Sequence, residues 1–518
     1  MTQGSNWIDY VILALYAVLM IAVAVYTKNR SGSVNDFLLA GKKGLNGWMT
    51  AFAYGTTYFS AVIFIGYAGQ FGRAFGLASV WIGIGNALIG TLFAWLVLAK
   101  RTKNMTRRLD SKTMPDFFEK RYASKNLKFV SAVIIFIFLI PYSASVYNGL
   151  SSLFEIVFGI PGWVVMIALA ALTAVYLFFG GYFATALSDF IQGIIMIVGV
   201  VCMVLCFMNH GNVSWDISKI ASDPNLTWFT FNAESKGLYG STASLLSLIL
   251  LTSLGVWALP QTIHKYYAIR DKKAIQQGVV VSTAFALIIG FIAYFTGALS
   301  HFFPETAGVT DANVIPTMLS LAIPAGLTGV IAVLILSASM STLSSVSLAG
   351  ASVIAVDLYK GKLNEKASDK QVNIVMRVLC LAFVAISVVL AILNERFGIA
   401  AIAYMMGISW GTLAGCFIGP YVLGVLWKRV TKPAVWTSIV SSLVLTVVLI
   451  FVFGYDKNGW SCSLGTALKS GIGTSPMIGV ICMLFSLAIT AIVSLCTKRP
   501  SDEVLAEAFD KPLENEIK

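Results

Sequence analysis

The sequence has few charged residues and few cysteines. Asp, Glu, Lys and Arg make up 12% of its 518 residues, whereas 58% are hydrophobic. A soluble globular protein carries about 25% charged residues, so this composition excludes a large water-soluble enzyme. The seven cysteines are scattered through apolar stretches without CxxC spacing, which excludes a domain built on disulfides.

Motifs for ATP hydrolysis and for metal-dependent catalysis are also missing. The chain contains no GxxxxGK[ST] motif, which argues against an ATP-driven pump. Its three histidines, His210, His264 and His301, lie far apart in the sequence and at the ends of apolar segments. They therefore support neither a metal cluster nor a catalytic triad.

Long hydrophobic runs fill most of the chain. A membrane-spanning helix needs about 20 predominantly apolar residues, and thirteen segments meet that requirement. The first lacks the basic start and cleavage site of a signal peptide, so we interpret it as a retained helix. The predicted fold class is an all-α polytopic membrane protein without a separate soluble domain. The predicted spans are 7–27, 47–70, 77–99, 128–158, 161–180, 184–208, 240–264, 275–300, 325–357, 371–394, 398–427, 433–454 and 475–497.

The basic residues lie mainly in every second connecting segment. With the N-terminus outside, the inside segments hold 29 of the 36 Lys and Arg residues, the outside segments hold six, and Arg377 lies within a span. Cytoplasmic loops of membrane proteins carry this excess of positive charge. We therefore expect a multi-pass protein of the cell membrane, embedded in the lipid bilayer, with its N-terminus outside and its C-terminus cytoplasmic. Charges that alternate sides form no single basic face, so a nucleic-acid partner is not expected.

Two predicted spans contain residues that interrupt a helix. The second carries the polar, glycine-containing stretch 55–60 near its middle, and the seventh carries Gly255 and Pro260. Proline removes a backbone donor and disturbs the preceding turn, and carbonyls freed in this way can coordinate a cation. Glycine and proline are also generally commoner in membrane helices. Because the two interruptions lie five spans apart, the pattern suggests repeats of spans 2–6 and 7–11.

A single carboxylate lies deep in the sixth predicted span. Asp189 has no Lys or Arg in the same span to pair with it, and a carboxylate at that depth is costly without a partner. We therefore expect it to face a bound cation. The alternative is a helix-end aspartate that reaches water or caps a terminus.

The ninth predicted span carries a row of hydroxyl side chains. Their spacings of three and four residues predict that they line one face of a helix. Such a face can simply form hydrogen bonds to a neighbouring helix. Combined with an interrupted helix and a carboxylate, it could instead supply the oxygen atoms that a sodium ion requires. These residues are Ser337, Ser341, Ser344 and Ser345.

Several segments of the chain resemble the sodium/solute symporter family, which includes carriers of proline, pantothenate, sialic acid and glucose. The resemblance covers nearly the whole chain and is strongest in GGYFATALSDFIQG, LPQTIHKYYAIRDKKAIQQG, MSTLSSVSL followed by VDLY, and IGPYVLGVLWKRVTKPA. It implies a LeuT-type inverted-repeat bundle with an additional N-terminal helix. The implied division is residues 1–46 for that helix and an inside loop, 47–208 and 240–427 for the two repeats, 433–497 for two C-terminal helices, and 498–518 for a cytoplasmic tail.

The resemblance also implies which residues bind sodium, Na+ being the coupling ion. A first site would use the backbone carbonyls of Thr56, Phe59 and Ala338 with the hydroxyls of Ser341 and Thr342. A second site, found in only some members of the family, would use Asp189, Ser341, Ser344 and Ser345. The residues expected near the solute are Tyr58, Ser60, Tyr142, Trp257 and Gln261.

The expected function is sodium-coupled symport of a small organic solute into the cell by alternating access. Tyr58 stands where the proline carriers have aspartate, while TTYFSAVIFIGYAGQFG and GVWALPQT look closer to the pantothenate carriers. Tyr142 stands where the sialic acid carriers have arginine. The solute is thus expected to be a pantothenate-like carboxylate or an amino acid such as proline. The alternatives are a proton-coupled carrier, with Asp189 as the protonated group, and a membrane sensor without turnover.

Overall fold

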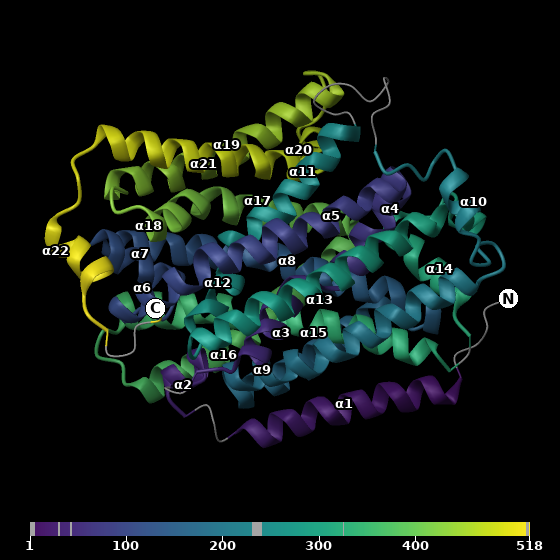
Figure 1. Ribbon diagram of the computed structural model, residues 1–518, viewed down its shortest axis with the longest axis horizontal. Coiled ribbons are helices and arrows are strands. Elements are labelled where there is room, and N and C mark those ends of the chain that lie inside the picture. Colours follow the sequence, from purple (N-terminus) through teal and green to yellow (C-terminus); the bar gives the residue numbers. More distant parts are fainter. Residues whose placement is uncertain are drawn as a thin grey trace.

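The computed structural model describes residues 6–28, 32–41, 44–229, 241–324, 326–513 and 517, which form an all-helical bundle. No strand occurs in these residues, in agreement with the predicted fold class. The long helices run side by side along the longest axis of the molecule (Figure 1). They are α1 (Trp7–Thr27), α8 (Lys125–Phe158), α9 (Gly162–Asn209), α11 (Ser241–Leu254), α13 (Lys272–Ala298), α15 (Thr328–Ser352), α16 (Asp369–Phe397), α17 (Ile402–Ile418), α19 (Lys432–Asn458) and α21 (Ser475–Cys496).

Shorter helices complete the bundle and its two ends. They are α2 (Val34–Leu39), α3 (Gly47–Tyr58), α4 (Ala68–Phe75), α5 (Val80–Gly85), α6 (Lys100–Arg108), α7 (Met114–Tyr122), α10 (Ile217–Ser222), α12 (Pro260–Tyr267), α14 (Val314–Ala322), α18 (Gly424–Leu426), α20 (Leu464–Ile472) and α22 (Asp502–Leu505).

The predicted spans are largely helical in the structure. Eleven stretches of the described residues are long and apolar enough to cross a membrane. Two of them, Val62–Arg108 and Gly162–Asn209, each contain parts of two predicted spans. At 1.5 Å per residue the 48 residues of α9 reach about 72 Å, far more than the roughly 30 Å bilayer core. The chain bends between its two spans at Gly181, where φ is +59°. Residues 240 and 325, at the edges of two predicted spans, lie outside the described residues.

The most buried helices lie at the centre of the bundle. In an 18-residue apolar segment of the stretch that begins with α15, and in one of the stretch that begins with α17, 89% of the residues are buried, whereas the corresponding share in α1 and α19 is 28%. In Figure 1, α1 and α19 form opposite edges, where their apolar side chains would contact lipid. α15 can occupy the centre because its many Ser, Ala and Gly residues allow neighbouring helices to approach closely. At Gly350, for example, an added Cβ would lie 2.6 Å from a ring atom of Phe383.

Both predicted interruptions are present. α3 ends at Tyr58, and the next residue, Phe59, has φ −91° and ψ 93°. α11 is followed by a short 3₁₀ turn and by non-helical backbone at Ala258 and Leu259, before α12 begins at Pro260. Gly55, expected to contribute to the first break, instead lies inside α3. It is needed for close packing, because a Cβ there would lie 2.5 Å from the Phe285 ring.

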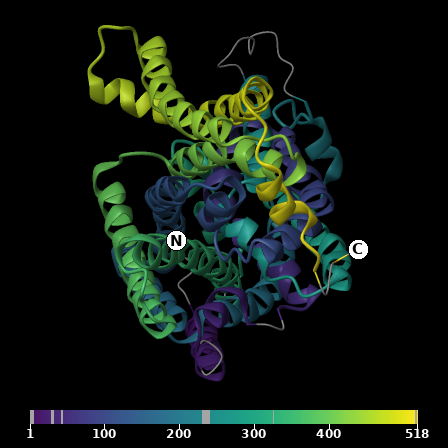
Figure 2. The same cartoon turned by 90° about the vertical axis from the view of Figure 1, so that its left-hand side faces the viewer.

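One end of the bundle carries most of the basic loops and the C-terminal segment. Figure 2 shows the yellow C-terminal segment lying across this end. Lys128 contacts Asp116 at 2.9 Å and Glu119 at 2.8 Å, joining α8 to α7. Burial opposes ionisation of Asp116, but Lys128 and Lys120 outweigh it and hold the pKa of this carboxyl below its usual value. This ion cluster ties the connecting loop to the bundle.

Candidate ion and solute site

The break after α3 lies directly against the hydroxyl face of α15. The carbonyl oxygen of Thr56 lies 3.2 Å from Ser341 Oγ and 3.3 Å from Thr342 Oγ1. Ser341 Oγ also lies 3.1 Å from the carbonyl oxygen of Ala338. All four residues are fully buried. The structure thus brings together four of the five oxygen donors predicted for the first sodium site.

The end of α3 explains why a carbonyl is free to take part. The last four carbonyls of a helix have no partner within it, and they carry the negative end of its dipole. Thr56 belongs to that last turn, and Phe59, the fifth predicted donor, is the first residue beyond the helix. Oxygens that hold a hard cation at about 2.3–2.6 Å lie roughly 3.4 Å apart. The separations around Ser341 are close to that value, so the group suits a small monovalent cation.

Asp189 is paired, contrary to expectation. Its Oδ2 lies 3.4 Å from Nζ of Lys265, which belongs to α12. The same Nζ lies 2.8 Å from Ser345 Oγ and 5.1 Å from the centre of the Tyr182 ring. Asp189 is 0% and Lys265 1% exposed. The prediction of an unpaired carboxylate was wrong because the partner comes from another span.

The four residues predicted for a second sodium site have diverse partners. Ser344 Oγ donates to the carbonyl of Ser341 within the same helix, at 2.9 Å. The Ser341 hydroxyl faces Thr56, and Ser345 is bound to Lys265. Asp189 Oδ1 has no hydrogen-bond partner among the described residues. An ammonium group therefore stands between two of the predicted ligands.

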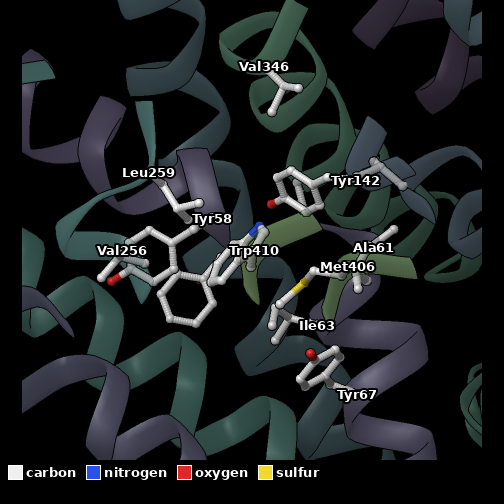
Figure 3. Packing of buried hydrophobic residues seen from close by; sticks show 14 of the residues in the cluster. Tyr58, Ala61, Ile63, Tyr67, Tyr142, Val256, Leu259, Val346, Met406 and Trp410 are labelled. Atoms are coloured by element: carbon white, nitrogen blue, oxygen red, sulfur yellow. The ribbon is translucent and has the colours of Figure 1, made fainter. Parts of the chain in front are cut away.

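Three side chains near the breaks carry polar atoms with no hydrogen-bond partner in the described part of the chain. They are the Tyr142 hydroxyl, the Trp410 indole N–H and both amide atoms of Gln261. The Tyr142 and Trp410 rings pack edge to face with 5.4 Å between their centres, and Figure 3 shows the two side chains near each other. The Tyr142 hydroxyl also faces the side chains of Ser60 and Thr342. Because buried polar groups normally have partners, these atoms are candidates for contacts to a solute.

The other residues predicted near the solute already have partners. The Tyr58 hydroxyl is hydrogen-bonded to Thr91 Oγ1, and Trp257 Nε1 donates to the carbonyl of Ile89 at 2.9 Å. Ser60 Oγ accepts from the backbone N–H two residues further on, at 3.2 Å. The polar atoms of Tyr58 and Trp257 are therefore already hydrogen-bonded within the protein.

Two residues near these sites, Lys265 and Trp410, were not predicted from the sequence. Lys265 was assigned to an inside connecting segment, whereas it lies in α12 and is buried. A usable signal was present, because it is the one lysine of a largely apolar and aromatic stretch that follows Pro260. Trp410 lies in a predicted span, and no local pattern distinguished it from a tryptophan that only packs.

A cavity of about 680 Å³ lies near the end of the bundle opposite the basic loops, where Asn148, Asp311 and Glu395 are among its lining residues. Its polar wall includes Arg73, which is paired with Asp311 and donates to the Val309 carbonyl at 3.1 Å. The cavity is also lined by Gly66, Ile402 and Ala403. Tyr67 follows Gly66 in the chain, and its hydroxyl lies 3.5 Å from the carbonyl oxygen of Ala403. In Figure 3, Ile63 and Met406 are seen between Tyr67 and the Tyr142–Trp410 pair.

The sequence is similar to a family of sodium symporters and to two proline transporters. A family model described as "Sodium:solute symporter family" matches residues 37–441. The osmoregulated proline transporter of Bacillus subtilis is 30% identical over 500 residues, covering 94% of this chain and 95% of that protein. A sodium/proline symporter of Staphylococcus aureus is 28% identical over 470 residues, or 86% of each chain.

Solved structures support the predicted LeuT-type fold. A Na+-coupled sialic acid symporter, in a substrate-bound outward-open state, matches with a TM-score of 0.77 at 18% identity, over 96% of this chain and 99% of that one. A manganese transporter of Eremococcus coleocola matches with a TM-score of 0.53 at 15% identity, over 87% and 94% of the two chains.

Proposed function

Because the chain belongs to the sodium:solute symporter family, we propose that its α3–α15 oxygen cluster binds the sodium ion that drives uptake of a small carboxylate-bearing solute. Sodium-coupled solute symport is the activity of the protein, which is a multi-pass transporter of the cell membrane and not an enzyme. The observation that carries the proposed ion site is the Thr56 carbonyl, within 3.3 Å of two hydroxyls of α15.

Ion and solute share structural elements, which supports coupling between them. Thr342 is a proposed ion ligand and also faces the Tyr142 hydroxyl. Thr56 belongs to the same interrupted span as Tyr58 and Ser60. An ion that holds this break against α15 therefore also orders the solute pocket. Such coupling is reciprocal and typically amounts to about 1–3 kcal/mol.

The sodium gradient supplies enough free energy for strong accumulation. A tenfold gradient gives about 1.4 kcal/mol and a potential of 100 mV about 2.3 kcal/mol for each ion. Together these support roughly 500-fold accumulation of a neutral solute with one sodium ion. Bulk uptake therefore requires no second ion.

The unpartnered donors suggest the chemistry of the solute. Tyr142, Trp410 and Gln261 can each donate a hydrogen bond to a carboxylate, while Tyr58 and Trp257 can pack against an apolar part. The two relatives above are named for proline, so we propose an amino acid of about that size as the first solute to test. A pantothenate-like monoanion is the second candidate, because the Tyr58 phenol offers no negative charge to an amine.

The distribution of the basic loops indicates the direction of transport. We infer that residues 47–208 and 240–427 are the two inverted repeats and that the end with the basic loops is cytoplasmic. The solute then enters from the 680 Å³ cavity and passes the layer that includes Tyr67 and Met406. Alternating access requires this layer and the opposite end of the bundle to open in turn.

Uptake into proteoliposomes with imposed gradients tests this function. We expect labelled proline, or else labelled pantothenate, to accumulate with an inward sodium gradient and not with an equal potassium gradient. Accumulation driven by a proton gradient without sodium would overturn the ion assignment in favour of a proton-coupled carrier. Solute binding without accumulation under any gradient would instead favour a sensor.

A further inference from the structure

A buried lysine occupies the region where a second sodium ion is expected. Lys265 Nζ lies 3.4 Å from Asp189 Oδ2 and 2.8 Å from Ser345 Oγ, two of the four predicted ligands. We propose that this ammonium group takes the place of the second ion, so that the transporter moves one sodium ion with each solute. The inference rests on the proposed function, because it concerns the stoichiometry of that symport.

The ammonium group of Lys265 occupies the position between Ser345 and Asp189 that a second sodium ion would need. Ser345 Oγ accepts a hydrogen bond from Lys265 Nζ at 2.8 Å. Thr57 Oγ1, whose hydrogen is directed to the carbonyl of Ala53, lies 3.2 Å from Ser345 Oγ. One carboxylate oxygen of Asp189 is bound to the same ammonium group. A sodium ion cannot share this position with the ammonium group, so the oxygens of Asp189 and Ser345 cannot both join a shell of roughly six ligands around a second ion.

The balance of charge also favours a single sodium ion. Asp189 is the one acidic residue in α3, α9, α12 and α15, and Lys265 neutralises it. The first ion site consists of neutral oxygens, so one sodium ion gives this region a single positive charge, which a carboxylate on the solute can cancel. A second sodium ion would add a buried charge without a partner, and such charges are strongly disfavoured.

Replacing the ammonium group should create the missing site. Lys265→Met keeps a side chain of similar length but removes the charge and the donors. The Asp189 carboxylate and the Ser345 hydroxyl oxygen then become available to a cation. In this variant the second sodium ion should bind, whereas in the unaltered protein the lysine fills its place.

The test measures sodium ions per transporter and per solute. For the full-length protein we expect equilibrium binding of one radioactive sodium ion per chain, a sodium Hill coefficient near one, and a sodium-to-proline uptake ratio of one. Lys265→Met should bind two ions, with a Hill coefficient approaching two. Lys265→Met/Asp189→Asn, the matched control, removes both charges and should bind one.

Different results overturn different conclusions. Two sodium ions per chain in the unaltered protein, or one in a folded Lys265→Met protein, would refute the role of Lys265 while leaving sodium symport intact. Absence of sodium binding and of sodium-driven uptake in the unaltered protein would refute the proposed function itself. If Lys265→Met does not fold, the ion count of the unaltered protein still decides the question.

Discussion

Two groups of oxygen atoms lie one helical turn apart on α15, and they differ in charge. The group around Ser341 consists of carbonyls and hydroxyls, and its polar atoms contact one another at 3.1–3.3 Å. The group around Ser345 contains a carboxylate and an ammonium group, both buried. A neutral group can bind and release a monovalent cation, whereas the second already contains a cation attached to the chain. Similar hydroxyls on one helix can thus serve an exchangeable ion and a permanent one.

The largest expected effect comes from breaking the permanent ion pair. Asp189→Asn leaves the ammonium group of Lys265 buried without a counter-charge, and removing one partner of a buried pair costs about 3–5 kcal/mol. The free energy of unfolding in detergent should fall by that amount. Lys265→Met/Asp189→Asn should recover most of the loss. Equal losses in the single and double variants would show that the pair itself matters little for stability.

Removing hydroxyls from the neutral oxygen group around Ser341 should lower the affinity for sodium rather than the stability of the fold. Ser341→Ala/Thr342→Ala deletes two ligands, each contributing about 1.5 kcal/mol or more as a contact to a charged group. The sodium concentration for half-maximal uptake should therefore rise at least about 100-fold. The matched control is Ser339→Ala on the same helix, whose hydroxyl donates to its own helix at Ile335. Undiminished sodium-driven accumulation in the double variant would contradict the ion site.

Removing a proposed solute contact should have a smaller effect than removing two proposed ion ligands. Gln261→Ala removes an amide with no partner among the described residues, so it should cost about one hydrogen bond, or roughly tenfold in the solute KM. Sodium binding measured without solute should stay the same. Trp257→Phe is the comparison, because its N–H is directed to the Ile89 carbonyl and its loss should change KM less. A larger effect of Trp257→Phe would reverse these roles.

The smallest effect concerns an ion cluster within reach of water. Burial opposes ionisation of Asp116, yet Lys128 and Lys120 lower its pKa below the usual value. The cluster therefore stabilises the fold above the unfolded pKa of about 3.9, and this contribution is lost as the pH falls through the lower folded pKa. The difference in unfolding temperature between the unaltered protein and Asp116→Asn should be constant from pH 8 to 5 and shrink below about pH 4. A difference that shrinks near pH 6 would contradict this assignment.

The fold could be predicted from short stretches of sequence because a bilayer requires each spanning helix to be a continuous apolar segment. The length and apolarity of each run are properties of consecutive residues, so the spans could be located without knowing their neighbours. The helix breaks near Phe59 and Pro260 could also be predicted, because proline and clustered polar residues disturb a helix at their own positions. Gly55 shows the limit of this approach. Its role became visible only once the Phe285 ring was found against it.

The sequence by itself determined the class of the molecule, its spans, its two interrupted helices and the hydroxyl face of α15, because these depend on residues close together along the chain. Tertiary structure alone decided which of those hydroxyls meet the Thr56 carbonyl and which meet an ammonium group. Asp189 and Lys265 are 76 residues apart, and the cost of a buried charge depends on whichever group the packing of other helices brings beside it.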